Sequence, residues 1–398
     1  MMNRPSTTHT ADAYAPHWAL YPQTYFVRPV PKASDPIDIN GDLTKSVWQG
    51  VPWSEPFGDI QGTDNHHPAH SPARTRFQAL YNDTHLMIGA VLDPSPDFPT
   101  QAHFTQRNEP IFQKDSDFEV FIDVFNRHHQ YKELELNALN TVWNLCLDKP
   151  YWDGGSEHSG RIAQPGEAQY YEVYHQQTAA RVLSGTLNDE HEGAQWSVEL
   201  ALAYEDLYSK VSTGADSDSI MPPRGRRPSP GTMWRINFSR VELKGEVNWT
   251  WQPQRVWDPS KGVYEGKIDM HLPDAWGYLV FVDGDEDNNG MMIPHEDPRH
   301  APSPYPLRDP LWPLRLTCIN IYYAQRHYHD QNHTYTNQLA DLAVDPDIVK
   351  PFDIQILANG EDDSYEVTVR ELHGTHAATI RQDRLLTILQ TEHEALGR

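Results

Sequence analysis

Two stretches, DFEVFID at residues 117–123 and YKELELN at residues 131–137, alternate apolar and polar side chains. Successive side chains of a β-strand point to opposite faces of a sheet, so this alternation predicts two strands that each have one apolar face. The apolar faces consist of Phe118, Val120 and Ile122 in the first stretch and Leu134, Leu136 and Ala138 in the second. Asn126-Arg127 lies between the two stretches and predicts a turn there.

Similar β-rich segments continue on both sides of this pair. They occupy residues 74–80, 85–92, 141–147, 179–187, 195–203, 233–243 and 277–282. Many short strands with few helices favour an antiparallel β-sandwich. We therefore expect residues 37–282 to form one mainly β, antiparallel sandwich, with Trp196, Val198, Trp234 and Ile236 in its core beside the apolar faces described above.

The rest of the chain divides into three parts by composition. Residues 1–36 are rich in Pro, Thr and polar groups, which predicts a loose N-terminal arm. Residues 283–310 are acidic and then Pro-rich, which predicts a linker. Residues 311–329 have helical spacing of large side chains, and strand-like segments follow at residues 354–358 and 365–371. The sequence thus predicts a small α+β domain over residues 311–398.

Charge and composition limit the classes of partner. The net charge is −24, so the surface repels phosphate backbones and we expect no nucleic-acid partner. No apolar run of about 18 residues is present, so we expect no membrane span. The N-terminal residues lack the pattern of a signal peptide, which makes a cytoplasmic location the default expectation, with secretion left open. Cys146 and Cys318 lie far apart in apolar contexts and are expected to be buried thiols.

The polar faces of the predicted strands have a distinctive chemistry. Glu133, Glu135 and Asn137 share one face of their strand, and Arg235 and Asn237 lie opposite the apolar face of another. Like charges on adjacent strands repel, so these carboxylates need a cation, an arginine or a ligand hydroxyl nearby. A solvated sheet face is the alternative interpretation. Carboxylates and amides bind sugar hydroxyls with defined direction, so we interpret this face as a ligand site.

Tryptophans near these strands could provide the apolar surface that a sugar ring needs. Trp143 and Trp152 lie just beyond the Glu-rich strand, and Trp249 and Trp251 are two positions apart and would share one side of an extended segment. Any one of them could equally belong to the core. The predicted carbohydrate-binding set is Glu133, Glu135, Asn137, Trp143, Trp152, Arg235, Asn237, Trp249 and Trp251.

Segments spread over residues 37–282 resemble family 9 carbohydrate-binding modules, and more closely the stand-alone proteins similar to that family. They are IDINGD (residues 37–42), VW (47–48), ALYND (79–83), DSDFEVFID (115–123), YKELELNALNT (131–141), KPY (149–151), WSVE (196–199), WRINFSR (234–240), MH (270–271) and WGY (276–278). The resemblance implies a DOMON-like β-sandwich that binds carbohydrate, within carbohydrate catabolism, and it often implies structural calcium.

One further segment matches a calcium-loop pattern. Asp285, Asp287 and Asn289 alternate and Glu296 follows at the twelfth position, which is the spacing that surrounds a hard cation. The segment before the loop is strand-like and Pro294 disfavours an exiting helix, so a solvated acidic linker is the alternative. Calcium is therefore the one cofactor that the sequence predicts.

Three classes of function remain open from the sequence. The leading hypothesis is a carbohydrate-binding protein without catalysis. The second is a glycoside hydrolase or lyase that uses Glu133 and Glu135, because residues two apart on a strand fall near the separation that glycosidases need. The third is a structural or interaction module, whose protein partners the sequence does not identify. A face covered by the C-terminal domain would favour this third class.

Overall fold

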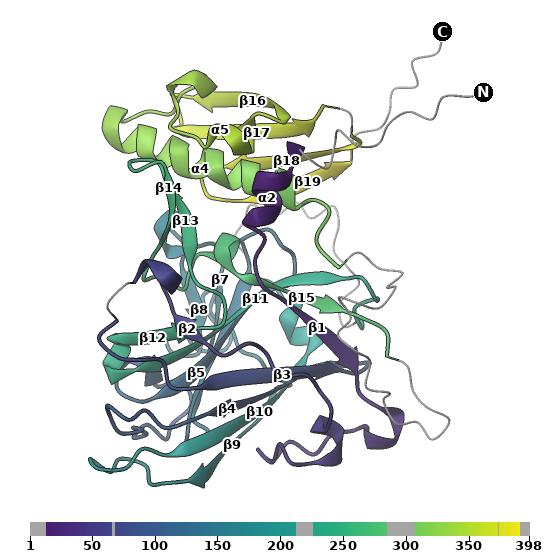
Figure 1. Ribbon diagram of the computed structural model, residues 1–398, viewed down its shortest axis with the longest axis vertical. Helices are drawn as coiled ribbons and strands as arrows, with labels where there is room; N and C mark the ends of the chain where they lie inside the picture. The colour runs from purple at the N-terminus through teal and green to yellow at the C-terminus, as the bar shows by residue number, and fades with distance from the viewer. Residues whose placement is uncertain (1–12, 66–67, 212–225, 285–306, 373, 391–398) are drawn as a thin grey trace, which may run out of the picture.

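A computed structural model describes residues 13–65, 68–211, 226–284, 307–372 and 374–390 of the chain (Figure 1). Its described part contains a curled 13-stranded sheet, a two-stranded hairpin, and a four-stranded sheet beside a long helix. The strands of the large sheet are β1 (Thr24–Pro29), β2 (Gly58–Asp59), β3 (Thr75–Tyr81), β4 (His85–Leu92), β5 (Asp117–Asp123), β6 (Tyr131–Asn137), β7 (Val142–Leu147), β8 (Glu157–Ser159), β9 (Gln177–Ser184), β10 (Gln195–Ala203), β11 (Met233–Glu242), β12 (Val247–Thr250) and β15 (Gly277–Phe281).

The large sheet curls into two layers around one apolar core. The hydrogen-bonded order runs β8-β7-β6-β5-β11-β15-β1-β3-β4-β10-β9, with β12 and β2 attached to β11. The core between the layers includes Phe118, Val120, Ile122, Leu134, Leu136, Trp196, Val198, Trp234 and Ile236. The mainly β sandwich and its predicted core are confirmed. The strand pairs are antiparallel except those of β1, which is parallel to both β15 and β3.

The N-terminal residues contradict part of the predicted arm. Thr24–Pro29 form β1, whose Val27 is fully buried, and Ala15–Ala19 form the short helix α2. The loose arm is therefore wrong for these residues. The prediction of a loose arm was based on composition alone. Strand β1 is ordered by pairing with β15, at residues 277–281, and no local sequence pattern reveals a pairing over that distance. Residues 1–12 lie outside the described part.

The C-terminal unit is a small α+β structure, as expected. Its helix α4 (Trp312–Asn332) packs against the sheet formed by β16 (Phe352–Asn359), β17 (Ser364–Glu371), β18 (His376–Arg381) and β19 (Leu386–Gln390). The short helix α5 (Pro346–Val349) also contacts α4. Leu316, Ile319 and Tyr323, three of the large side chains at helical spacing, are buried on α4.

The two parts of the molecule share apolar cores. A hairpin of β13 (Arg255–Asp258) and β14 (Val263–Gly266) rises from the sandwich toward the C-terminal unit (Figure 1). Val256, Trp257 and Leu272 pack in one cluster with side chains of α4 and β17. The indole nitrogen of Trp257 donates to the carbonyl of Ala343 over 2.8 Å. Packing therefore continues across the boundary that composition placed at residues 283–310.

Two expectations from composition concern single features of the structure. Cys146 and Cys318 are buried free thiols, as predicted. In the described part of the chain, no helix combines the length and apolarity that crossing a bilayer requires.

Candidate functional site

Four carboxylates lie together on the face of β5 and β6 that points away from the sandwich core. They are Asp117, Glu119, Glu133 and Glu135, and we call them the carboxylate cluster. The strand register places Glu119 opposite Glu135, with Ser239 of β11 on its other side. Because Val120 and Leu134 point into the core, alternation directs all four carboxylates to the opposite face.

The carboxylate cluster is buried, and several of its oxygens lack partners. One oxygen each of Asp117, Glu119 and Glu135 lies within 4.8 Å of the other two. Both oxygens of Asp117 and one oxygen of each glutamate have no hydrogen-bond partner. Leaving such oxygens unpaired in the interior costs free energy. The arrangement is therefore complete only with a proton, a cation or a ligand.

The pKa values of the four carboxyl groups also indicate that the cluster lacks compensating positive charge. Burial raises the pKa of Glu119 to about 7, against a hydrogen bond from Ser239 that lowers it. Burial, followed by the charge of Glu119, raises the pKa of Asp117, Glu133 and Glu135 well above the usual range. Within the described residues, no Lys or Arg forms an ion pair with any of the four. Ionising all four carboxylates would therefore concentrate negative charge that no Lys or Arg of the described residues offsets.

Partly exposed side chains border the cluster on the solvent side. We call Tyr151, Trp152, Arg161 and His271 the rim. Tyr151 and Trp152 are 43% and 54% exposed, and the ring of Tyr151 packs edge-on against His271 with centroids 4.7 Å apart. The imidazole nitrogen Nε2 of His271 lies 3.9 Å from Glu133. Burial lowers the pKa of His271 to about 4, so the ring is neutral at pH 7 and leaves the charge of Glu133 uncompensated.

Trp143 forms the border between the cluster and the rim. It stands opposite Glu135 in the register of β6 and β7, and it is buried. The guanidinium of Arg161 lies 4.7 Å from the centre of its ring and pairs with Glu157. The indole nitrogen of Trp143 has no hydrogen-bond partner. The indole N–H of Trp143, a donor without a partner, therefore lies next to the carboxylate cluster, which has several acceptor oxygens without partners.

Three of the predicted polar residues lie elsewhere on this face and have structural partners. Asn137 donates to Asp115 and to the carbonyl of Phe104, and its oxygen accepts from two backbone N–H groups. Asn237 bonds the backbone of Gln252 in both directions. Arg235 donates to the carbonyl of Asp274 over 2.7 Å. The hydrogen-bonding groups of these three side chains are therefore engaged within the fold, although Asn137 lies opposite Asp117 in the strand register.

Trp249 and Trp251 share one side of their segment, as predicted, but that side faces the sandwich core. Both rings are buried in the main core. Trp249 stacks on Phe98, and Trp251 packs edge-on against Phe77. Their role as an exposed sugar platform is therefore wrong. Spacing showed that the two rings point the same way, but it did not show which way.

The C-terminal unit anchors two of the loops that provide the rim, those of Trp152 and His271. Arg384 is fully buried, and its guanidinium pairs with Asp153 over 3.0 Å and with Asp274 over 2.8 Å. Asp153 directly follows Trp152, and Asp274 lies three residues after His271. Arg326 of α4 also pairs with Asp153, donates to the carbonyl of Trp152 and lies 5.2 Å from the centre of its ring.

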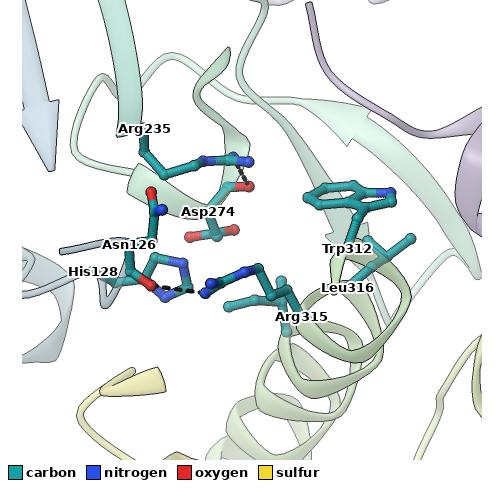
Figure 2. Close-up of a pocket in the computed structure, with 8 residues that line it drawn as sticks. Asn126, His128, Arg235, Asp274, Trp312, Arg315 and Leu316 are labelled. Carbon is teal, nitrogen blue, oxygen red and sulfur yellow. Dashed lines mark hydrogen bonds between the residues drawn. The ribbon is translucent and has the colours of Figure 1, made fainter. Parts of the chain in front are cut away.

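A small polar cavity lies at the junction of the two parts (Figure 2). Its lining includes Asn126, His128, Arg235, Asp274, Trp312, Arg315, Leu316 and Ile319, and its volume of about 20 Å³ suits one water molecule. Figure 2 shows Arg235 directed at Asp274 and Arg315 directed at Asn126. The cavity is too small for a sugar ring. The C-terminal unit therefore covers this part of the polar face.

Sequence reasoning missed several residues of the site. Asp117 and Glu119 have the same parity as Phe121, so alternation alone could have added them to the site. Tyr151 is adjacent to the predicted Trp152. His271 belongs to a segment that resembles the family, MH (270–271), but no pattern marked it as a site residue. Arg384 had no local signal, because it reaches the rim loops from a turn distant in sequence. The predicted calcium ligands Asp285, Asp287, Asn289 and Glu296 lie outside the described residues.

Comparison with known proteins gave matches only among solved structures. No family model and no curated protein sequence matches the chain. A candidate carbohydrate-binding protein from Bacteroides uniformis matches with a TM-score of 0.43 and 13% identity, over 65% of this chain and 99% of that chain.

A family 9 carbohydrate-binding module from Caldicellulosiruptor kristjanssonii matches in two complexes. The complex with cellotriose has a TM-score of 0.36 and 13% identity, over 67% of this chain and 96% of that chain. The complex with glucose has a TM-score of 0.36 and 14% identity, over 67% and 98%. These modules are of the family that the sequence segments resemble.

Proposed function

We propose that this protein binds a saccharide at the rim, above the carboxylate cluster. The observation that supports this most is the exposed ring of Tyr151 near Glu133 and the Arg161–Glu157 pair, with the exposed ring of Trp152 next to it in the chain. Exposed aromatic rings provide an apolar platform for the face of a pyranose. Charged groups next to them can donate to and accept from its hydroxyls.

The proposal keeps four of the residues that the sequence selected. Glu133, which approaches His271 of the rim, and Trp152 would contact the sugar, whereas Glu135 and Trp143 would support it from beneath. Asn137, Arg235, Asn237, Trp249 and Trp251 leave the proposal, since their partners are already within the fold. A role within carbohydrate catabolism stays an expectation from the family resemblance.

The two alternatives differ in support. The glycosidase hypothesis needs one protonated and one ionised carboxyl, and burial of Glu133 and Glu135 places both pKa values above the usual range. The structural hypothesis fits only the part of the face near Arg235, which the C-terminal unit covers. The exposed rim favours binding over both.

Titration calorimetry with neutral mono- and oligosaccharides, including glucose and cellotriose, tests the proposal. Trp152→Ala should weaken binding of whichever saccharide binds the wild type by at least about tenfold, because an exposed aromatic platform is lost. The matched control is Tyr174→Ala, which removes an exposed ring that is not part of the rim and should leave affinity unchanged.

Three results would contradict or redirect the proposal. If no saccharide in the panel binds, or if Trp152→Ala binds like the wild type, the rim is not the site. If the wild type releases reducing sugar from an oligosaccharide and Glu135→Gln does not, the glycosidase hypothesis replaces simple binding.

A further inference from the structure

We propose that Asp117, Glu119 and Glu135 hold one hard divalent cation, of the calcium class, on the sheet beneath the rim. This cation site shares Glu135 with the saccharide proposal, but its other two ligands, Asp117 and Glu119, are buried and take no part in that proposal, so the two can be tested apart. It is also distinct from the loop at residues 285–296 that the sequence pattern selected for calcium.

The geometry of the three carboxylates suits a cation of calcium size. Their ligand oxygens lie within 4.8 Å of one another. Calcium binds oxygens at 2.3–2.6 Å, so two ligands on opposite sides of it stand about 4.6–5.2 Å apart. Oxygen is the only ligand atom in the set, which favours calcium, magnesium or manganese over zinc or copper. All three side chains come from paired strands, which fix their positions.

Other buried acids of the same sheet show how the fold normally offsets such a charge. Asp123 accepts from the backbone N–H groups of Phe125, Arg127 and His128. Glu242 pairs with Arg240 over 2.7 Å. Each of these acids has direct compensation from the protein.

The proposed ligands differ from those acids in this respect. Asp117 is fully buried and neither of its oxygens has a partner, and Glu119 and Glu135 each leave one oxygen unpaired. Glu133 is not one of the three ligands, yet it is buried beside them and also leaves one oxygen without a hydrogen-bond partner. Four neighbouring acids without an ion-paired Lys or Arg, within the residues that the structure describes, indicate a positive charge supplied from outside the chain.

The cation itself is the probe for the test. The full-length protein is treated with EDTA, then titrated with CaCl₂ while its melting temperature is followed, and in parallel with terbium(III), whose emission a nearby tryptophan such as Trp143 sensitises. A ligand that binds only the folded state raises the melting temperature by mass action. We expect a saturable rise and saturable terbium emission that calcium displaces.

Isosteric variants locate the cation. Asp117→Asn and Glu135→Gln keep the side-chain shape and should each weaken calcium at least about tenfold, since even outer-shell partners of a metal contribute that much. The matched control is Asp287→Ala in the predicted calcium loop, which should bind like the wild type. Circular dichroism confirms that each variant is folded, and Glu119→Gln replaces any variant that is not.

Two outcomes would overturn the proposal. In the first, calcium, magnesium, manganese and terbium leave the wild type unchanged, which means that protons neutralise the cluster. In the second, Asp287→Ala loses the response while Asp117→Asn keeps it, which places the cation in the loop. The saccharide titration is measured separately, so failure of either proposal does not imply failure of the other.

Discussion

At the scale of single residues, His17 links the N-terminal helix α2 to the C-terminal unit. Its ring is buried, and Nε2 lies 3.0 Å from the carbonyl of Ile348 and 3.2 Å from the hydroxyl of Thr317. Burial lowers the pKa of His17 to about 4, against the hydrogen bond with Ile348 that raises it. The folded state therefore favours the neutral imidazole.

A pH dependence follows from this histidine. A lowered pKa means that the folded state binds fewer protons than the unfolded state below pH 6.5, so stability falls as the pH drops from 6.5 toward 4. The free energy of unfolding of the wild type should therefore exceed that of His17→Gln by more at pH 7.5 than at pH 4.5. Chemical denaturation of both proteins at the two pH values measures this difference, and a gap that stays constant or widens in acid would refute it.

Residue-scale predictions from the sequence succeeded where alternation determines direction. The core positions of β5 and β6 follow from parity, and parity also selected Glu133 and Glu135. Parity did not determine whether Trp249 and Trp251 face the core or the solvent, because this depends on which face of their strand the other layer of the sandwich covers. The partner of Arg235 could not be predicted from the sequence for a different reason. Its partner Asp274 belongs to a loop whose position depends on the C-terminal unit.

At the scale of elements, one buried arginine holds the two rim loops together. Arg384 lies between Asp153 and Asp274, and the hydroxyls of Tyr322 and Tyr323 complete the network. Removing one partner of a buried ion network leaves the remaining charges uncompensated, which typically costs about 3–5 kcal/mol.

Arg384→Met should therefore lower the free energy of unfolding by about 3–5 kcal/mol. The matched control is Arg381→Met, whose pair with Asp383 is partly exposed and should contribute about 1 kcal/mol or less. Urea denaturation of both variants makes the comparison. Equal effects of the two substitutions would show that the buried network does not anchor the loops.

Elements were predictable from sequence when their neighbours in the chain are also their neighbours in space. The pair of β5 and β6 meets this condition, and so does helix α4 with its regular apolar spacing. Strand β1 does not, since it pairs with β15 and β3 rather than with a sequential neighbour. The loops of the rim have no periodic pattern, so their approach to the carboxylate cluster appears only in the folded chain.

At the scale of the whole molecule, apolar packing joins the sandwich and the C-terminal unit. One cluster contains Val256 and Leu272 together with Leu314 and Val367. A second contains Tyr278 and Val280 of β15 together with Trp312, Leu316 and Ile348. Neither part can unfold without exposing apolar surface of the other.

Scanning calorimetry should therefore show one cooperative unfolding transition for the full chain, with the calorimetric enthalpy close to the van't Hoff enthalpy. The two domains that composition predicted would each give a transition of their own if they were independent. Two resolved peaks, or an enthalpy ratio well above one, would show that the shared clusters do not couple the two parts.

The parallel pairing of β1 has a consequence for synthesis on the ribosome. Thr24 pairs with Tyr278, so translation of about 250 further residues, at about 5–20 residues per second, separates the appearance of the two strands. Until then β1 has no partner on that side, and its unpaired backbone groups form an open edge. The sandwich therefore closes late in translation. Chaperones that bind nascent chains can contact β1 before β15 has been synthesised.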